Sequence, residues 1–157
     1  MKSSKRKTSA IRVIRKIQAL KPASAKALRE AGVRLRLLGT GLYRAGFKVV
    51  NCDLVVKFPE KTGGRGHAAS EMRRLKRLKK LGVLDKFLPE VLYYDKPTGV
   101  IAMRYYPAYE DFEAQADALG HLAGVLIHRL TRVHCSDIHT DNVRQGVKNA
   151  VVIDLGL

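Results

Sequence analysis

Three polar residues near the end of the chain have types and spacing suited to holding a metal ion beside a phosphate. Asp137 and Asn142 are five residues apart, and Asp154 follows twelve residues later at the end of an apolar run. Mg²⁺ takes oxygen ligands and keeps several waters, so one or two such side chains plus phosphates complete its shell. A further carboxylate can accept or orient the proton of an attacking hydroxyl. The pattern therefore predicts a Mg²⁺–nucleotide site within residues 134–157.

Two charged residues upstream have types that would complement such a site. Lys57 follows the apolar run 54–56, and a lysine in an apolar strand is costly unless its ammonium group finds a partner. Glu71 is the only acidic residue between Lys61 and Asp85, so it is one candidate for that partner. Two alternatives stay open, namely that the ammonium group of Lys57 reaches water and that Glu71 makes a surface ion pair with a neighbouring arginine.

A glycine turn precedes these residues. Gly39 and Gly41 flank Thr40, and Arg44 follows shortly after them. A glycine lets the backbone approach a phosphate closely, at a distance where a Cβ atom would clash. The same spacing also occurs in hairpin turns that bind nothing, and this alternative stays open.

Length and composition limit the class of protein. A chain of 157 residues with 46% hydrophobic residues is one globular domain or two small lobes. It contains no run of about 18 apolar residues, so no transmembrane helix is predicted, and no signal-peptide core follows the basic N-terminus. Cys52 and Cys135 fit no metal or redox spacing. We therefore expect a cytoplasmic protein with two free thiols, no disulfide and no zinc.

The positive charge is concentrated in two places. The chain has a formal net charge of +16, and residues 1–36 contain twelve Lys or Arg and one Glu, which gives +11. A second basic block extends over residues 73–80. Such a balance predicts an anionic partner, which is a nucleic acid, a nucleotide or an acidic protein.

The N-terminal segment, residues 1–32, is predicted to be basic and helical. We expect a mobile arm over residues 1–8, a helix ended by Pro22, and a second helix that begins at the N-cap Ser24 and runs to about Ala31. Two interpretations of this helical hairpin stay open. It is either a packing element with a solvated basic face or a docking arm for nucleic acid or a protein partner.

The rest of the chain predicts an α+β fold. Its strands form a five-stranded antiparallel sheet with one covering helix, followed by a minimal helical part. A flexible loop is expected over residues 61–66, before that helix. The expected strands are 33–37, 43–50, 54–58, 88–94 and 100–106, the helices are 67–81 and 112–133, and two short strands are 143–147 and 150–153.

Taken together, residues 33–157 resemble the protein-kinase-like superfamily. The glycine turn resembles G-x-G-x-x-G with Arg44 in place of the third glycine, and residues 54–57 resemble the V-A-I-K strand. Residues 137–142, D-I-H-T-D-N, resemble the catalytic loop D-x-x-x-x-N, and residues 154–156, D-L-G, resemble D-F-G. The histidine two residues after Asp137 is similar to that of aminoglycoside and choline phosphotransferases and several atypical kinases.

The resemblance implies a two-lobe fold, ATP and Mg²⁺ as cofactors, and a role for each motif residue. Asp137 would be the catalytic base, and Lys57 would bind the phosphates and pair with Glu71. Asn142 and Asp154 would hold Mg²⁺. The remaining nucleotide contacts would come from the glycine turn and from the hinge between the lobes, namely Gly39, Gly41, Arg44, Met103 and Tyr105.

We expect a helical segment at 1–32, a kinase-like N-lobe at 33–106 and a truncated C-lobe at 107–157. The chain stops directly after D-L-G. It is expected to be a naturally minimal kinase, as in a small genome such as that of a bacteriophage, a pseudoenzyme, or a chain completed by a homodimer mate. The predicted function is phosphotransfer from ATP to a hydroxyl, as in protein Ser/Thr kinases. The alternative is a catalytically inactive kinase-like protein that binds nucleic acid or a protein through its basic surface.

Overall fold

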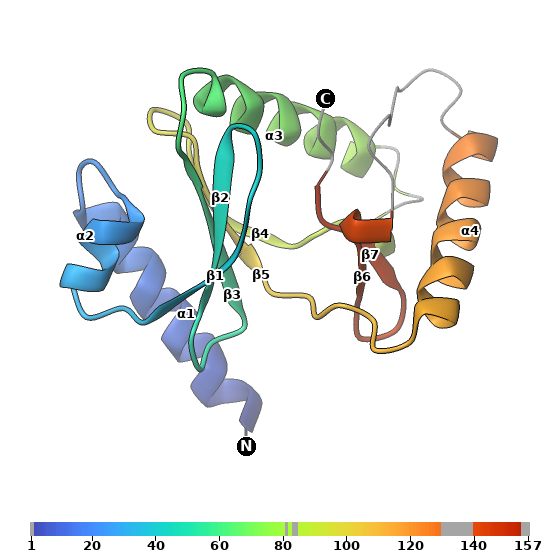
Figure 1. The fold of residues 1–157 in the computed structure, drawn as a ribbon, viewed down its shortest axis with the longest axis horizontal. Coiled ribbons are helices and arrows are strands. Elements are labelled where there is room, and N and C mark those ends of the chain that lie inside the picture. The colour runs from blue at the N-terminus through green and yellow to red at the C-terminus, as the bar shows by residue number, and fades with distance from the viewer. Residues whose placement is uncertain (1, 81, 83–84, 130–139, 155–157) are drawn as a thin grey trace. The chain divides into compact units, whose positions relative to one another are not determined.

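The computed structural model describes residues 2–80, 82, 85–129 and 140–154 of the chain (Figure 1). The polypeptide divides into two compact units. The first unit comprises Met1–Ala69 and Glu90–Tyr105, and the second comprises Ser70–Pro89 and Tyr106–Leu157. Helix α3 (Gly64–Lys80) begins in the first unit and continues in the second.

Two helices open the first unit. Helix α1 (Lys2–Ala19) begins at the second residue, so it starts earlier than predicted and includes residues 2–8, which were expected to form an arm before it. No glycine or proline interrupts this segment, and its lysines and arginines have high helix propensity. Helix α2 (Ala25–Glu30) begins as predicted, because the Ser24 hydroxyl oxygen accepts a hydrogen bond from the backbone N–H of Ala27 at 3.1 Å.

The five predicted strands form one antiparallel sheet with the order β1-β2-β3-β5-β4, which confirms the predicted α+β class and the predicted sheet. β1 runs through Gly39 to Thr40, so the predicted interruption at residues 39–41 is wrong for its first two residues. Gly39 pairs with Gly46, and Thr40 pairs with Ala45. The bounds of the strands are β1 Leu35–Thr40, β2 Arg44–Val49, β3 Leu54–Pro59, β4 Val91–Asp95 and β5 Val100–Arg104.

One face of the sheet packs against α1 and α2. Phe47, Val56 and Ala102 are opposed in neighbouring strands, so their side chains project from the same face. They belong to one buried apolar cluster with residues of the two helices, of which Ile17 and Leu28 are almost completely buried. The structure therefore supports the interpretation of the N-terminal helices as a packing element.

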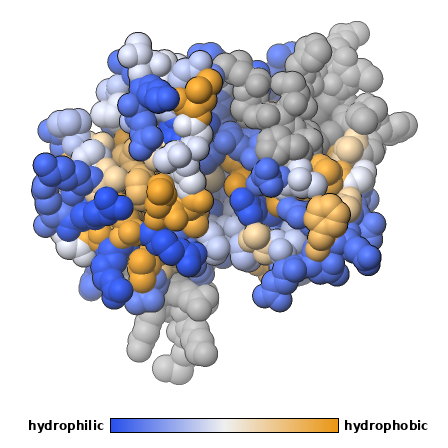
Figure 2. Space-filling model, in the orientation of Figure 1, coloured by the Kyte–Doolittle hydropathy of each residue, from blue (hydrophilic) through white to orange (hydrophobic). Residues whose placement is uncertain are grey.

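The edge strand β1 is the least covered strand of the sheet. Leu37 and Leu38 keep 51% and 46% of their surface exposed. Figure 2 shows an apolar area on the viewed face of the first unit, where Figure 1 draws β1. A register shift between Leu37 and Gly39 marks an irregularity at Leu38, of the kind that commonly breaks the regularity of edge strands.

Helix α3 begins earlier than predicted. Residues 64–66 are helical, so the predicted loop over residues 61–66 is shorter than expected. A Cβ atom at Gly64 would lie 2.5 Å from the carbonyl oxygen of Tyr43 and 2.9 Å from the Cβ of Pro59. Glycine is therefore required at this position, because the first turn of the helix lies directly against the end of β3.

The second unit contains a long helix and a small hairpin. Helix α4 (Phe112–Arg129) contacts both strands of the hairpin, β6 (Val143–Gln145) and β7 (Ala150–Val152), which pair antiparallel. Two short 3₁₀ turns, η1 (Asp85–Phe87) and η2 (Thr140–Asn142), complete the described elements. The predicted end of the long helix, residues 130–133, lies outside the described residues. Within the described part of the chain, no helix combines the length and the apolar character needed to cross a membrane.

Candidate active site

Lys57 lies in a row of residues that crosses the sheet on the face opposite to α1 and α2. In β3 it is opposed by Gly46 of β2 on one side and by Ile101 of β5 on the other. Gly46 is in turn opposed by Gly39 of β1. Because directly opposed residues share a face, the Lys57 side chain has two glycine positions beside it, and two neighbouring strands carry no side chain there.

The packing of the chain itself does not require these two glycines. Among the described residues, a Cβ atom at Gly39 would meet nothing within 4 Å, and one at Gly46 would meet only the Gly39 carbonyl oxygen at 4.0 Å. Neither residue has a positive φ. The two glycines therefore leave a bare strip of backbone next to a lysine, which is the surface that an approaching phosphate group needs.

The turn that follows places two further predicted residues near this strip. The N–H of Gly41 donates to the carbonyl oxygen of Arg44 at 2.7 Å and closes the hairpin between β1 and β2. Arg44 is the first residue of β2 and lies two positions before Gly46, so the two share a face. Gly39, Arg44 and Lys57 thus lie on one face of the first unit.

Lys57 and Glu71 are the buried charged residues of the described chain, with 9% and 4% of their surface exposed. Lysine and glutamate are almost never buried to this extent unless they are paired. Neither residue lacks an interaction. Lys57 belongs to the first unit and Glu71 to the second, so their predicted pairing stays a prediction.

The predicted hinge begins on the same face of the sheet as Lys57. Met103 is buried, and it is opposed by Val55, which is two residues from Lys57 in β3. Two backbone donors of this segment are already used, because the N–H of Arg104 donates to Glu90 at 2.9 Å and that of Tyr105 donates to Asp53 at 3.0 Å. An adenine ring bound at this segment would therefore need contacts with groups other than these two N–H groups.

Sequence reasoning missed two residues around this face. Gly46 gave a signal that could have been used, because a glycine inside a strand often marks a close approach of another group. Lys48 gave none, because only the folded chain shows that its ammonium nitrogen lies 3.9 Å from the centre of the Tyr105 ring. This contact is a cation–π interaction that covers one face of the tyrosine.

In the second unit, the hairpin brings the two predicted metal ligands to neighbouring positions. The N–H of Ile153 donates to the carbonyl oxygen of Asn142 at 2.9 Å, directly beyond the opposed pair of Val143 and Val152. Asp154 is the next residue, and both Asn142 and Asp154 are half-buried. A carboxylate and an amide at neighbouring positions of the backbone are of the types that supply the oxygen ligands Mg²⁺ prefers.

Helix α4 fixes the position of this pair. The side-chain amide of Gln115 donates to the carbonyl oxygen of Thr140 at 2.7 Å and so ties the start of η2 to the helix. Sequence reasoning also missed this contact, because the two residues are far apart in the chain. The predicted catalytic base Asp137 lies outside the described residues, as do His139 and residues 155–156.

Cys52 lies in the turn between β2 and β3, and it is a buried free thiol. Burial raises the pKa of this thiol above its usual value, and the nearby carboxylate of Asp53 raises it further. The thiol therefore stays protonated at neutral pH and has little nucleophilic character. Cys135 lies outside the described residues.

Comparison with known proteins gives matches to solved structures alone, because no protein-family model and no curated protein sequence matches the chain. The streptomycin–ATP complex of APH(2")-IIa matches with 18% identity and a TM-score of 0.48, covering 77% of this chain and 45% of that one. Its gentamicin complex matches with 18% identity and a TM-score of 0.48, covering 78% and 45%. A choline/ethanolamine kinase family protein from Mesorhizobium loti matches with 18% identity and a TM-score of 0.46, covering 87% and 62%. The chain spans about half the length of the solved structures it matches.

Proposed function

We propose that this protein is a kinase-like phosphotransferase, which uses ATP and Mg²⁺ to transfer the γ-phosphoryl group to a hydroxyl. The observation that carries the proposal is the row formed by Gly39, Gly46 and Lys57. A buried ammonium group beside a bare strip of backbone provides both a charge and a space for phosphate oxygens. Such a reaction needs mainly positioning and electrostatic stabilisation, because the protein does little covalent chemistry.

In the first unit, the proposed role of each residue follows from its position. Lys57 neutralises charge on the phosphates, and the backbone at Gly39 and Gly41 lies over them. Arg44 adds a second positive charge near the glycine turn. Met103 and Tyr105 take the adenine ring, and we propose apolar packing on Met103 because the N–H group of Tyr105 is already used within the chain.

In the second unit, Asn142 and Asp154 hold Mg²⁺, and Asp137 orients the acceptor hydroxyl and accepts its proton. When bound, the metal neutralises charge on the phosphates. Gln115 of α4 maintains the geometry of the pair through Thr140.

Glu71 is proposed as the partner of Lys57. The two buried charged side chains of the described residues have opposite signs. An ion buried without a partner costs several kcal/mol, roughly, and pairing offsets much of that cost. A pairing of Lys57 with Glu71 would account for the burial of both.

The acceptor is proposed to be a protein Ser or Thr hydroxyl. The support is the net charge of +16, which favours a macromolecular or acidic target over a small neutral one. A homodimer mate that completes the catalytic lobe, a cytoplasmic location and an origin in a bacteriophage stay predictions.

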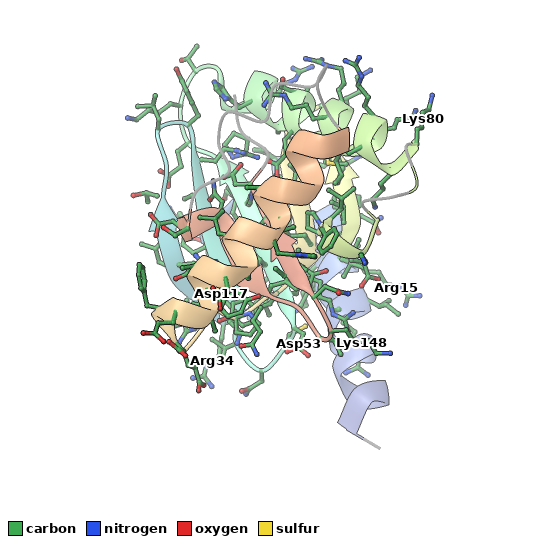
Figure 3. All side chains as sticks on the ribbon, turned by 90° about the vertical axis from the view of Figure 1, so that its right-hand side faces the viewer. Arg15, Arg34, Asp53, Lys80, Asp117 and Lys148 are labelled. Carbon is green, nitrogen blue, oxygen red and sulfur yellow. The ribbon has the colours of Figure 1, made fainter. Side chains whose placement is uncertain are left out.

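The test is transfer of label from γ-labelled ATP in the presence of Mg²⁺, with the protein alone and with cell extract. Asp137→Ala and Asp154→Ala should each abolish the labelling. Asp117→Ala is the matched control, because Asp117 is an exposed carboxylate on α4 of the same unit (Figure 3). Labelling by the wild-type protein that persists in both site variants would contradict the assignment of these residues.

The second candidate is a kinase-like protein that binds a partner without catalysis, and the concentration of positive charge is the observation that favours it. A rise in melting temperature on addition of Mg²⁺ and ATP, with no transfer of label to any acceptor, would favour this candidate. The absence of both effects would exclude a nucleotide site altogether.

A further inference from the structure

The exposed face of α3 in the second unit is entirely basic. Four basic side chains recur at positions i, i+3, i+4 and i+7, so they lie on one face of the helix. All four are exposed, and a fifth exposed basic residue, Lys79, flanks them. We call this surface the α3 basic face, and its four residues are Arg73, Lys76, Arg77 and Lys80. Figure 3 shows Lys80 extending outward at the end of the helix.

The apolar and acidic side chains of this part of the helix lie on its buried side. Leu75 and Leu78 keep 2% and 1% of their surface exposed, and Glu71 keeps 4%. Glu71 is the only acidic residue of α3, so no carboxylate of the helix lies among its exposed cations. Like charges at these spacings destabilise a helix slightly, so the arrangement costs stability unless an anion binds there.

We propose that the α3 basic face binds the phosphate backbone of double-stranded DNA without regard to sequence. From residue 73 to residue 80 the helix rises by about 10 Å. A duplex presents about six negative charges over that length of its axis. The five exposed cations of this segment nearly match that density, and the major groove of B-form DNA is wide enough to admit an α-helix.

The same surface fits other polyanions less well. A membrane-bound amphipathic helix needs apolar side chains beside its cations, but the leucines of α3 are buried. Binding of single strands depends on aromatic side chains on which bases stack, and α3 contains no Phe, Tyr or Trp. Duplex RNA has a major groove that is too deep and narrow to admit side chains to its floor.

The test measures binding of the full chain to a labelled 20-base-pair DNA duplex by fluorescence anisotropy at several salt concentrations. The variant replaces all four residues of the α3 basic face by glutamine, which keeps the helix propensity. We expect its affinity to fall about tenfold or more. The slope of log K against log salt should fall by about three to four, because each phosphate contact contributes about 0.9.

A control variant removes the same charge elsewhere. It replaces four exposed cations outside α3 by glutamine, namely Arg12, Arg15, Lys21 and Lys96, and we expect most of the affinity and of the salt slope to remain. A second variant, Arg73→Lys with Arg77→Lys, should bind like the parent, because the contact with phosphates needs the positive charge of these side chains and not their guanidinium groups. Lys57→Met should bind DNA like the parent, which separates this surface from the proposed nucleotide site.

Four results would overturn the proposal. The first is an equal loss of affinity for the DNA duplex in the α3 and control variants. The second is a loss of affinity in the charge-conserving variant. The third is equal or tighter binding of a single strand or an RNA duplex of the same length. The fourth is tighter binding to vesicles of anionic lipid or to a poly-glutamate peptide than to the DNA duplex. A thermal melt of each variant shows that folding is retained.

Discussion

The two faces of the five-stranded sheet are built from the same strands, yet their side chains differ in kind. The face that packs on α1 and α2 has Phe47, Val56 and Ala102 in register, and all three are buried. The next row along the sheet has Gly39, Gly46 and Lys57 on the other face. One face is filled with apolar volume, whereas the other exposes backbone beside a charge.

Because side chains alternate along each strand, one face of the sheet can form the core while the other face carries the proposed site. Apolar side chains on the first face stabilise the fold through burial, at roughly 25 cal/mol for each Å² of apolar surface removed from water. The glycines contribute no such burial, and a strand interior is an unfavourable place for them. The proposed phosphate site would account for their presence beside a buried lysine, whereas stability would not.

The largest expected effect on the packed face comes from Leu28→Ala in α2. Leu28 is fully buried in the cluster between the helices and the sheet, so the substitution should lower the free energy of unfolding by about 2–5 kcal/mol. Urea denaturation measures this loss. Affinity for Mg²⁺–ATP, measured well below the melting temperature, should be unchanged. A parallel fall in affinity would show that the two faces do not have separate tasks.

The opposite pattern is expected for Gly39→Ala combined with Gly46→Ala. A Cβ atom at either position has space in the folded chain, and alanine loses less backbone entropy on folding, so stability should stay constant or rise by about 0.5–1 kcal/mol. The added methyl groups occupy the strip proposed for phosphates, so ATP should bind about tenfold more weakly. Isothermal titration calorimetry and urea denaturation together separate the two effects. Unchanged binding of ATP would remove the glycine strip from the site.

A smaller effect is expected for Ser24→Ala at the start of α2. The substitution removes the hydrogen bond to the N–H of Ala27, and the loss of an N-cap of this kind costs about 1 kcal/mol. Ser24→Asp is the control, because aspartate can also cap the helix. The comparison is made by thermal denaturation. Equal stability of the alanine variant and the parent would show that α2 does not depend on its cap.

Much of the sheet could be predicted from the sequence, because the strands are short segments of continuous or alternating apolar residues with Gly, Pro, Asn or Asp near their ends. The same sequence signals predicted the wrong ends for some strands and helices. Gly39 and Thr40 were predicted to break β1, but they pair with β2. Gly64 was predicted to lie in a loop, but it is the first residue of α3, and it is a glycine there because the backbone of Tyr43 leaves no space for a side chain. In both cases tertiary contacts override the local preference of glycine for loops.

Residues of the candidate site could be predicted where their type alone indicated a role. They could not be predicted where their role depends on which residues are paired between neighbouring strands. Lys57 and Asp154 stand out by chemistry, since each is a charged residue at the end of an apolar run. Gly46 becomes part of the site only when the pairing of β2 with β3 is known. The hydrogen bonds that use the N–H groups of Arg104 and Tyr105 were likewise invisible, because their acceptors, Glu90 and Asp53, lie on other segments.

The most direct test of a nucleotide site on the Lys57 face is the melting temperature of the protein with increasing ATP in the presence of Mg²⁺. A ligand at 100 times its Kd stabilises the folded state by about 2.7 kcal/mol. The parent protein should show a rise of that kind and lose most of it when EDTA removes the metal. Lys57→Met should fold but lose the rise, whereas Lys96→Met, at an exposed lysine in the turn between β4 and β5, should keep it. An equal rise in Lys57→Met and the parent, or no rise in the parent, would contradict the account.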